Sequence, residues 1–327
     1  MPLRQGEGVA ELRRAHDLIY LVTTMSSSNT SALRRLALAA IQPLTYVVPK
    51  KIGRPWRRKI RDRMVLPDAD VVFVSFPKSG RTWVRVMMSR VYHTHLAVPG
   101  DELFEFDNLH KLDPRIPRML ITHDGEPWHT PQGLQTDKSV YAGKKVILLA
   151  RNPIDVAVSR YFHIRNRATW IPYPEYKDMP IGEFVWAPLG GLPTIVAYMN
   201  IWDRARATIG DLLMVRYEDF RSQPEATLAK VTAFLGLPAT SEQIAEAVSY
   251  AAFENLRKKE ELGAISSHRL GARQAGNPDS LKVRRGKVRG YLDYFSAEEV
   301  ARMEAYVRDQ LAPSYGYGQA ASAGQSV

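Results

Sequence analysis

The stretch VVFVSFPKSGRTW, residues 71–83, limits the folds open to this chain more than any other segment does. Its first four residues are apolar and three of them are β-branched, which predicts a buried strand, and the Pro-Lys-Ser-Gly turn leads into a helix-forming segment. A tight turn between a strand and a helix presents free backbone N–H groups and the positive end of the helix dipole to one point. The sequence therefore predicts an anion-binding loop with phosphate as its expected guest.

The same strand-then-helix order recurs along the chain. Apolar runs predict strands at 70–76, 118–123, 144–150 and 212–217, and helical patterns are expected at 80–92, from Pro153 onward and at 225–236. A chain of 327 residues, 45% of them hydrophobic, is long enough to bury a large core. Strands separated by helices predict an α/β fold, a P-loop-like three-layer α/β/α arrangement with a central parallel sheet.

The anion-binding loop differs from that of ATP- and GTP-hydrolysing proteins, whose pattern is G-x-x-x-x-G-K-[ST]. Ser75 stands in place of the first glycine, Arg81 stands in place of the lysine, and the lysine comes earlier, at Lys78. The third strand is followed by Arg151, where a nucleotidase needs a magnesium-binding aspartate. We therefore expect an anion that is neutralised by side chains and not by a metal.

Four motifs in order resemble those of the cytosolic-type sulfotransferases. PKSGRTW (77–83) is similar to their 5′-phosphosulfate loop, P-K-S-G-T-T-W, and RNPIDVAVSRYFH (151–163) to their 3′-phosphate segment, R-N-P-x-D-x-x-V-S-x-Y. VRYEDF (215–220) is similar to their Y-E-D strand end, and RRGKVRGYLDYFS (284–296) to their C-terminal loop, R-K-G-x-x-G-x-W. The resemblance spans roughly residues 71–296 and identifies the chain as a member of the sulfotransferases that use 3′-phosphoadenosine-5′-phosphosulfate (PAPS).

This resemblance implies a set of donor-binding residues. The co-substrate would be PAPS, the product adenosine 3′,5′-bisphosphate (PAP), and no metal would be required. The residues implied at the 5′ end are Lys78, Ser79, Gly80, Arg81 and Thr82, with Trp83 for the adenine and Tyr217 for the adenosine; those implied at the 3′-phosphate are Arg151, Ser159, Arg284, Arg285 and Gly286. Guanidinium groups and backbone N–H groups suit that phosphate.

The resemblance also implies a catalytic pair for in-line sulfonate transfer. His123 ends the second predicted strand, at the position of the histidine in the family's K-T-H, and would take the proton of the acceptor. Lys78 would stabilise the bridging oxygen as charge develops on the departing phosphate. Asp124, where we expect leucine, is a candidate to orient the imidazole or to contact the acceptor.

Two departures from the family pattern concern the loops. Arg81 replaces a threonine, and Tyr291 replaces the tryptophan of the C-terminal loop. The family's dimer motif, K-x-x-x-T-V-x-x-x-E, is not found after Gly290, so the oligomeric state stays open.

The positive charge of the chain is concentrated at one end. Of the net charge of +11, residues 1–66 account for +9, with 13 Lys or Arg and 4 Asp or Glu, so the rest is nearly neutral. We expect a basic N-terminal extension at 1–66, a helical arm or linker, then a sulfotransferase domain at 67–312 and a flexible tail at 313–327. The extension either contacts a membrane surface or a polyanion, or is a solvated basic helix and linker packed on the body; nucleic acid is not an expected partner.

Other features bear on localisation and on the acceptor. The chain has no cysteine and no secretion signal, so we expect a cytoplasmic protein, with membrane association left open. Aromatic residues are dense between 161 and 202 and form either a lid over the acceptor or core packing: Tyr161, Phe162, Trp170, Tyr173, Tyr176, Phe184, Trp186 and Tyr198. The acceptor class, a hydroxyl or amine on a small molecule, a glycan or a lipid headgroup, stays open.

Two further function classes are compatible with parts of the sequence. A P-loop-type nucleotide or small-molecule kinase would share the strand, loop and helix, although it lacks the expected glycine, lysine and aspartate here. A non-catalytic module that binds a nucleotide or a polyanion would use the basic extension. Ligand binding separates all three classes.

Overall fold

The computed structural model describes residues 60–125, 127–168, 171–261 and 285–317. The chain divides into two compact units, Met1–Ala69 and Asp70–Val327. In the first unit residues 60–65 are helical, and the 3-10 helix η1 (Leu66–Asp68) follows. Most of the expected basic extension lies outside the described residues. Among the helices of the described segments, none has the length and apolarity to span a bilayer.

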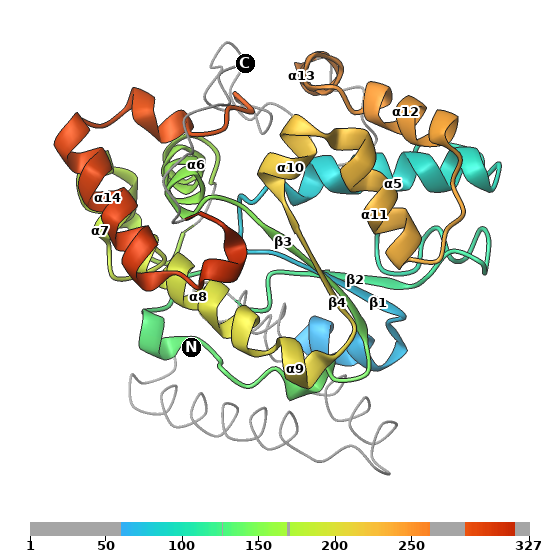
Figure 1. The fold of residues 1–327 in the computed structure, drawn as a ribbon, viewed down its shortest axis with the longest axis horizontal. Helices are drawn as coiled ribbons and strands as arrows, with labels where there is room; N and C mark the ends of the chain where they lie inside the picture. The colour runs from blue at the N-terminus through green and yellow to red at the C-terminus, as the bar shows by residue number, and fades with distance from the viewer. Residues whose placement is uncertain (1–59, 126, 169–170, 262–284, 318–327) are drawn as a thin grey trace, which may run out of the picture. The chain divides into compact units, whose positions relative to one another are not determined.

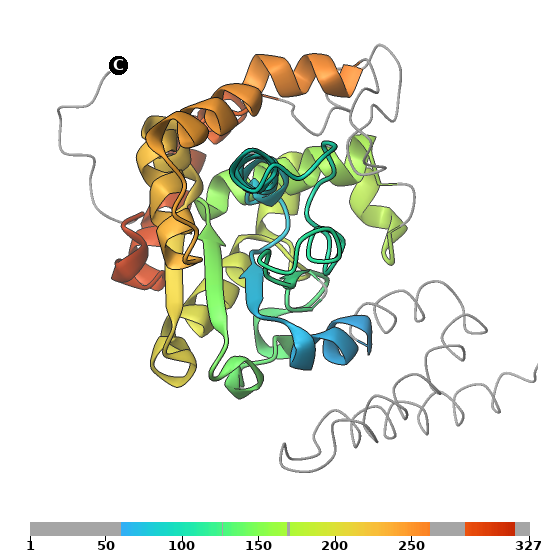
Figure 2. The same cartoon turned by 90° about the vertical axis from the view of Figure 1, so that its right-hand side faces the viewer.

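Four parallel strands form the centre of the second unit. They are β1 (Val71–Val74), β2 (Met119–Thr122), β3 (Lys145–Ala150) and β4 (Leu212–Arg216), in the spatial order β2-β1-β3-β4. β1 pairs in parallel with β2 and with β3, and β3 pairs in parallel with β4. Figure 2 shows the strands with their carboxyl ends pointing the same way. The predicted strands and their parallel arrangement are confirmed.

One face of the sheet is covered by α5 (Arg81–His95), α11 (Pro224–Phe234) and α12 (Ser241–Tyr250). Alternate strand residues point toward these helices, so Phe73 and Ile147 share one buried cluster with Met87 of α5 and Val231 of α11. This alternation follows from the two-residue period of a strand. The cluster also holds the first turns of α5 in place above the sheet.

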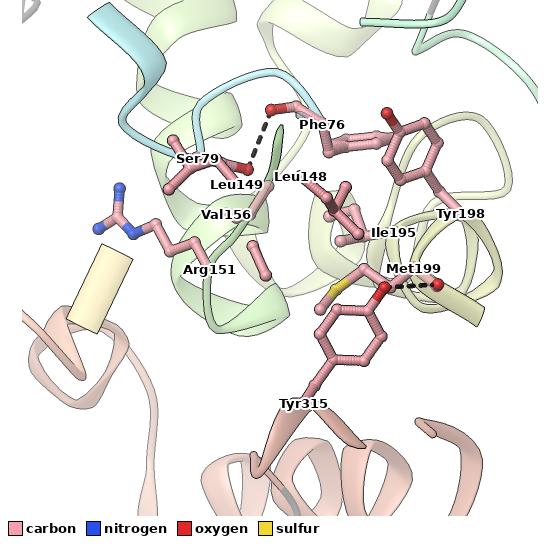
Figure 3. Close-up of a pocket in the computed structure, with 11 residues that line it drawn as sticks. Phe76, Ser79, Leu148, Leu149, Arg151, Val156, Ile195, Tyr198, Met199 and Tyr315 are labelled. Atoms are coloured by element: carbon pink, nitrogen blue, oxygen red, sulfur yellow. Dashed lines mark hydrogen bonds between the residues drawn. The ribbon is translucent and has the colours of Figure 1, made fainter. Parts of the chain in front are cut away.

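The opposite face is covered by α6 (Pro153–Asn166) and α8 (Leu192–Arg204). Leu148 of β3, Val156 of α6 and Ile195 of α8 line a narrow, mainly apolar cavity between these layers (Figure 3). The cavity has room for little more than a water molecule, so it is a packing gap and not a nucleotide site. In Figure 1 the two groups of helices lie on opposite sides of the strands, which confirms the three-layer α/β/α fold.

The remaining elements surround these layers. The helices are α7 (Ile181–Trp186), α9 (Arg206–Ile209), α10 (Tyr217–Ser222), α13 (Phe253–Glu261) and α14 (Ala297–Gln310), and the 3-10 helices are η2 (Pro131–Gly133), η3 (Ser139–Tyr141), η4 (Pro174–Lys177), η6 (Gly290–Asp293) and η7 (Pro313–Tyr315).

The C-terminal segment is folded further than the sequence predicts. Tyr315 is 1% exposed and donates its hydroxyl hydrogen to the carbonyl of Met199 at 2.8 Å (Figure 3). Tyr317 donates its hydroxyl hydrogen to the side-chain carboxylate of Glu218 at 2.6 Å. The expected tail therefore does not begin at residue 313, because two tyrosines anchor 313–317 to the body; residues 318–327 lie outside the described residues.

Candidate active site

Three loops meet at the carboxyl edge of the sheet. The segment after β1 is the Pro-Lys-Ser-Gly turn, β2 is followed by His123, and β3 is followed by Arg151. In the ladder Val74 stands opposite Thr122 on one side and Leu148 on the other. Because the carboxyl ends of neighbouring parallel strands lie together, residues far apart in sequence converge there, at the usual ligand crevice of such a sheet.

The turn after β1 is held in one conformation. Lys78 and Gly80 have positive φ values of 78° and 93°. A Cβ on Gly80 would lie 2.5 Å from the Tyr217 ring, so only glycine fits there. Ser79 is buried and donates its hydroxyl hydrogen to the carbonyl of Phe76 at 2.9 Å (Figure 3). Gly80 has no side chain to cap α5, so the first N–H groups of the helix face the turn.

Arg151 connects this turn to the C-terminal loop. Its Nη1 donates to the carbonyl of Lys78 at 3.1 Å, and its Nη2 lies 3.5 Å from the carbonyl of Lys287. The guanidinium carbon is 4.3 Å from the centre of the Tyr217 ring. Figure 3 shows the guanidinium pointing out of the apolar cavity. Arg151 therefore lies between two segments that the sequence assigns to opposite ends of the donor.

The start of α6 is fixed just after Arg151. The side chain of Asn152 caps the helix by accepting from the N–H of Ile154 at 2.9 Å, and the backbone N–H of Asn152 donates to the carboxylate of Glu218 at 2.9 Å. Burial raises the pKa of Glu218, while hydrogen bonds from Tyr317 and from Asn152 act in the opposite direction. Glu218 of the Y-E-D motif therefore has a structural role, because its carboxyl group accepts a hydrogen bond from the backbone just after β3.

A buried carboxylate anchors the C-terminal loop to α6. Asp155 is 3% exposed and accepts from the backbone N–H groups of Arg289 at 2.8 Å and Tyr291 at 3.2 Å. Burial raises its pKa, and Arg151 is the largest opposing influence. Arg289 stands at the second glycine of R-K-G-x-x-G-x-W and keeps a positive φ of 55°. The loop thus retains a left-handed residue without glycine.

The cations of the C-terminal loop are paired with a carboxylate. Arg285 Nη2 is 2.8 Å and Lys287 Nζ is 2.7 Å from the carboxylate oxygens of Asp293. Arg285 also donates to the hydroxyl of Tyr294 at 2.9 Å. The hydrogen bond from Lys287 lowers the pKa of Asp293, so this carboxylate is an anion held by two cations. Arg284 lies outside the described residues.

Aromatic rings pack near Trp83 of α5 and near Gly286 of the C-terminal loop. The Trp83 indole N–H donates to the carbonyl of Ala251 at 2.8 Å, and the ring packs edge-on against Tyr217 at 5.6 Å. A Cβ on Gly286 would lie 2.7 Å from the ring of Phe253. Phe253 therefore lies against the C-terminal loop, although no sequence motif indicated it. Ser159 on α6 and Thr82 on α5 are both half-buried.

The imidazole of His123 is held through both nitrogens. Nδ1 is 2.7 Å from the carbonyl oxygen of Ser75, and Nε2 is 2.9 Å from Arg81 Nη2. A carbonyl only accepts and a guanidinium only donates, so Nδ1 carries the hydrogen and Nε2 presents its lone pair. The hydroxyl of Tyr198 donates to the carbonyl of His123 at 3.2 Å, and burial raises the pKa of that hydroxyl.

Asp124 directs its carboxylate to a lysine and a tyrosine. The carboxylate is 2.6 Å from Lys138 Nζ and accepts from the hydroxyl of Tyr141 at 2.7 Å. The side chains of Lys138 and Asp124 are 3% and 9% exposed. Lys138 and Tyr141 were not expected from the sequence, because they lie in the irregular segment before β3 and carry no motif. Asp124 itself adopts a positive φ of 54°.

The aromatic residues between 161 and 202 are largely core. Tyr176 and Phe184 are buried in one cluster, against which Trp128, Tyr161 and Tyr173 pack in part. Tyr198 is also buried and meets Phe76 edge-on at 5.1 Å, beside the His123 backbone. Trp170 lies outside the described residues. Core packing accounts for most of these residues, and Tyr198 also holds the backbone of His123 through its hydroxyl.

Comparison with known proteins identifies the family. Residues 68–314 match the family model described as the sulfotransferase domain. The chain belongs to the sulfotransferase family. All four sequence motifs fall inside the matched residues, so the family assignment made from them is confirmed.

Individual relatives are distant but cover most of the chain. Cytosolic sulfotransferase 14 of Arabidopsis thaliana is 28% identical over 272 residues, 76% of this chain and 76% of that protein. The amine sulfotransferase of Oryctolagus cuniculus is 24% identical over 269 residues, 76% of this chain and 83% of that protein.

Solved structures show the same fold. Mouse sulfotransferase SULT7A1 complexed with PAP has a TM-score of 0.51 at 19% identity, over 76% of this chain and 86% of that chain. Retinol dehydratase in complex with androsterone and PAP has a TM-score of 0.54 at 19% identity, over 79% of this chain and 85% of that chain.

The Lys138–Asp124 pair yields a stability prediction for this sulfotransferase. Lys138→Met leaves a buried carboxylate without its cation and should lower the free energy of unfolding by about 3–5 kcal/mol. Lys138→Met/Asp124→Asn should recover much of this loss, because asparagine is neutral and tolerates a positive φ. Urea unfolding of both variants measures the difference. A free energy of unfolding of Lys138→Met within about 0.5 kcal/mol of the wild-type value would contradict the structural role of the pair.

Proposed function

We propose that this sulfotransferase moves a sulfonate group in line from PAPS to a hydroxyl or amine acceptor, with His123 as general base. The observation that carries the proposal is the lone pair of His123 Nε2, fixed by the Nδ1 contact with Ser75, beside an anion-binding turn. Ser75 is the residue immediately before that turn's Phe-Pro-Lys segment. One backbone carbonyl therefore ties the orientation of the base to the position of the loop.

The site suits a donor that carries phosphates on both the 3′ and the 5′ oxygen of its ribose. We assign the first N–H groups of α5 and Lys78 to the 5′ side and Arg151 and Arg285 to the 3′-phosphate. Arg151 reaches the carbonyls of both Lys78 and Lys287, which supports a donor that spans the two segments. The carboxylate of Asp293 pairs with Arg285 and Lys287 in the way that a phosphate group would. Both fold neighbours described above were solved with PAP, which supports PAPS as the donor.

The residues of this chain supply base catalysis and charge stabilisation. When bound, the donor supplies a sulfonate on a phosphate leaving group. His123 Nε2 takes the proton of the acceptor, and the positive charge that develops on the ring is stabilised by the Ser75 carbonyl at Nδ1. Lys78 offsets negative charge on the side of the leaving phosphate. The roles proposed for Ser79, Gly80, Arg81, Thr82, Trp83, Ser159, Tyr217, Arg284 and Gly286 remain those implied by the family motifs.

The acceptor is proposed to be a small molecule that carries a hydroxyl or an amine. An amine sulfotransferase among the relatives and a fold neighbour solved with androsterone support this class. The names of the plant relatives support a cytoplasmic location, and a membrane contact of the basic extension stays a proposal.

The donor proposal predicts binding without a metal. PAP should stabilise the folded protein by about 2.7 kcal/mol at a free concentration 100 times its Kd, and so raise the melting temperature, because the side chains present carry the neutralising charge. Addition of a chelator should leave this shift unchanged, and ATP with magnesium should give a smaller one. An absolute magnesium requirement would favour the kinase alternative instead. Stabilisation by polyanions but by neither PAP nor ATP would favour the non-catalytic binding module.

The bridging position of Arg151 predicts a loss of donor affinity on substitution. Arg151→Met removes a charged donor worth about 1.5–3 kcal/mol, so the Kd for PAP should rise about tenfold to a hundredfold. Arg115→Met, an exposed arginine paired with Asp113, is the matched control and should bind normally. Calorimetric titration measures both. Wild-type affinity in Arg151→Met would show that the 3′-phosphate lies elsewhere.

The assignment of the base predicts a separation of binding from turnover. His123→Ala should keep PAP affinity close to that of wild type while lowering kcat about 10²-fold or more with an alkyl alcohol as acceptor. His95→Ala is the control, because His95 lies at the C-terminal end of α5, away from the anion-binding turn. Acceptor turnover with labelled PAPS provides the measurement. Unchanged kcat in His123→Ala would remove His123 from the mechanism.

A further inference from the structure

Two departures from the family pattern lie close together in this site. Arg81 stands where P-K-S-G-T-T-W has its first threonine, and Ile121 stands where K-T-H has its lysine. Ile121 and His123 are two positions apart along one extended segment, so they share a face of β2. Relative to the family pattern, the chain lacks a cation on this face and has one on the first turn of α5.

The Arg81 guanidinium lies against the end of β2. Its Nη2 is 2.9 Å from His123 Nε2, and its Nη1 donates to the carbonyl of Thr122. Because a guanidinium has only donors and stays protonated, it engages the lone pair that a general base needs. The side chain is half-buried, so this contact is partly shielded from water. The family motif assigns Arg81 to the donor and gives no indication of its contact with His123.

We propose that Arg81 is a latch that makes the base available only when a sulfonated donor is bound. The inference rests on the function proposed above. Without a sulfonate, the guanidinium holds Nε2 of His123. A sulfonate at the turn offers charged oxygens, which bind a guanidinium about twice as strongly as a neutral acceptor does. The guanidinium then turns to the sulfonate, and Nε2 faces the acceptor.

Once Arg81 has left His123 Nε2, the transfer of the sulfonate group balances in atoms and electrons. The acceptor oxygen forms a bond to sulfur while the bond between sulfur and the phosphate oxygen breaks, and that electron pair stays on the phosphate. The acceptor proton goes to His123 Nε2. Arg81 offsets the negative charge of the sulfonate oxygens, and Lys78 offsets that of the leaving group. Since PAP has no sulfonate, the latch distinguishes PAPS from PAP.

Binding measurements without acceptor test the latch. Arg81→Met should raise the Kd for PAPS about tenfold or more and change the Kd for PAP by less than about threefold, as one charged contact to the sulfonate is lost. Arg308→Met, which removes an exposed arginine from α14, is the control and should bind both ligands as wild type does. Equal losses of PAPS and PAP affinity in Arg81→Met would reduce Arg81 to a phosphate ligand and overturn the latch.

A second readout follows the imidazole itself. With ¹⁵N-labelled histidine, the Nε2 resonance of His123, assigned with His123→Gln, should move when PAPS is added and stay in place with PAP. In Arg81→Met it should already be displaced and no longer distinguish the two ligands. Identical responses to PAPS and PAP in the wild type would contradict the latch. Wild-type protein that binds neither ligand would instead contradict the proposed sulfotransfer, so the two failures are distinguishable.

Discussion

The parallel pairing of β1 with both β2 and β3 is the constraint on which the site depends. It sets Val74 opposite Thr122 and Leu148, so the residue after each strand emerges at one edge. The His123 ring can then reach the carbonyl of Ser75 at 2.7 Å. This one contact fixes the tautomer of the base and ties it to the start of the anion-binding turn. A register shift of one residue would point His123 to the other face of the sheet.

Buried carboxyl groups hold the rest of the site around this edge. Asp155 accepts from the backbone of the C-terminal loop, and Glu218 accepts from the N–H that follows Arg151. Burial is the largest influence on the pKa of both groups and raises it, so desolvation disfavours their ionised forms while the hydrogen bonds they accept support them. The hydrogen bonds that Asp155 and Glu218 accept therefore position the surrounding segments more than they stabilise the fold. They place Arg151 between the turn and the loop that follows Gly286.

Local patterns in the sequence predicted most of the fold and the outline of the site. Apolar runs marked all four strands, and the turn at Lys78 and Gly80 marked the anion-binding loop, because strand periodicity and turn chemistry are local. Contacts between distant segments left no such signal. Three such contacts are the ion pair of Asp124 with Lys138, the approach of Phe253 to Gly286, and the ion pairs of Asp293 with Arg285 and Lys287. Only the folded chain brings these residues together. The packing of Tyr315 was missed for the same reason, since a short polar terminus predicts fraying. The sequence showed the Arg81 substitution but not its contact with His123.

The decisive measurement is a crystal structure of the protein with PAP. We expect one phosphate in the turn at residues 77–82, within hydrogen-bonding distance of the first N–H groups of α5, with no metal ion beside it. We expect the other phosphate at Arg151 and Arg285, with the Asp293 ion pairs to the C-terminal loop broken or lengthened. PAP bound away from the carboxyl edge of the sheet, or bound there only through a metal ion, would show that the proposed donor site is wrong.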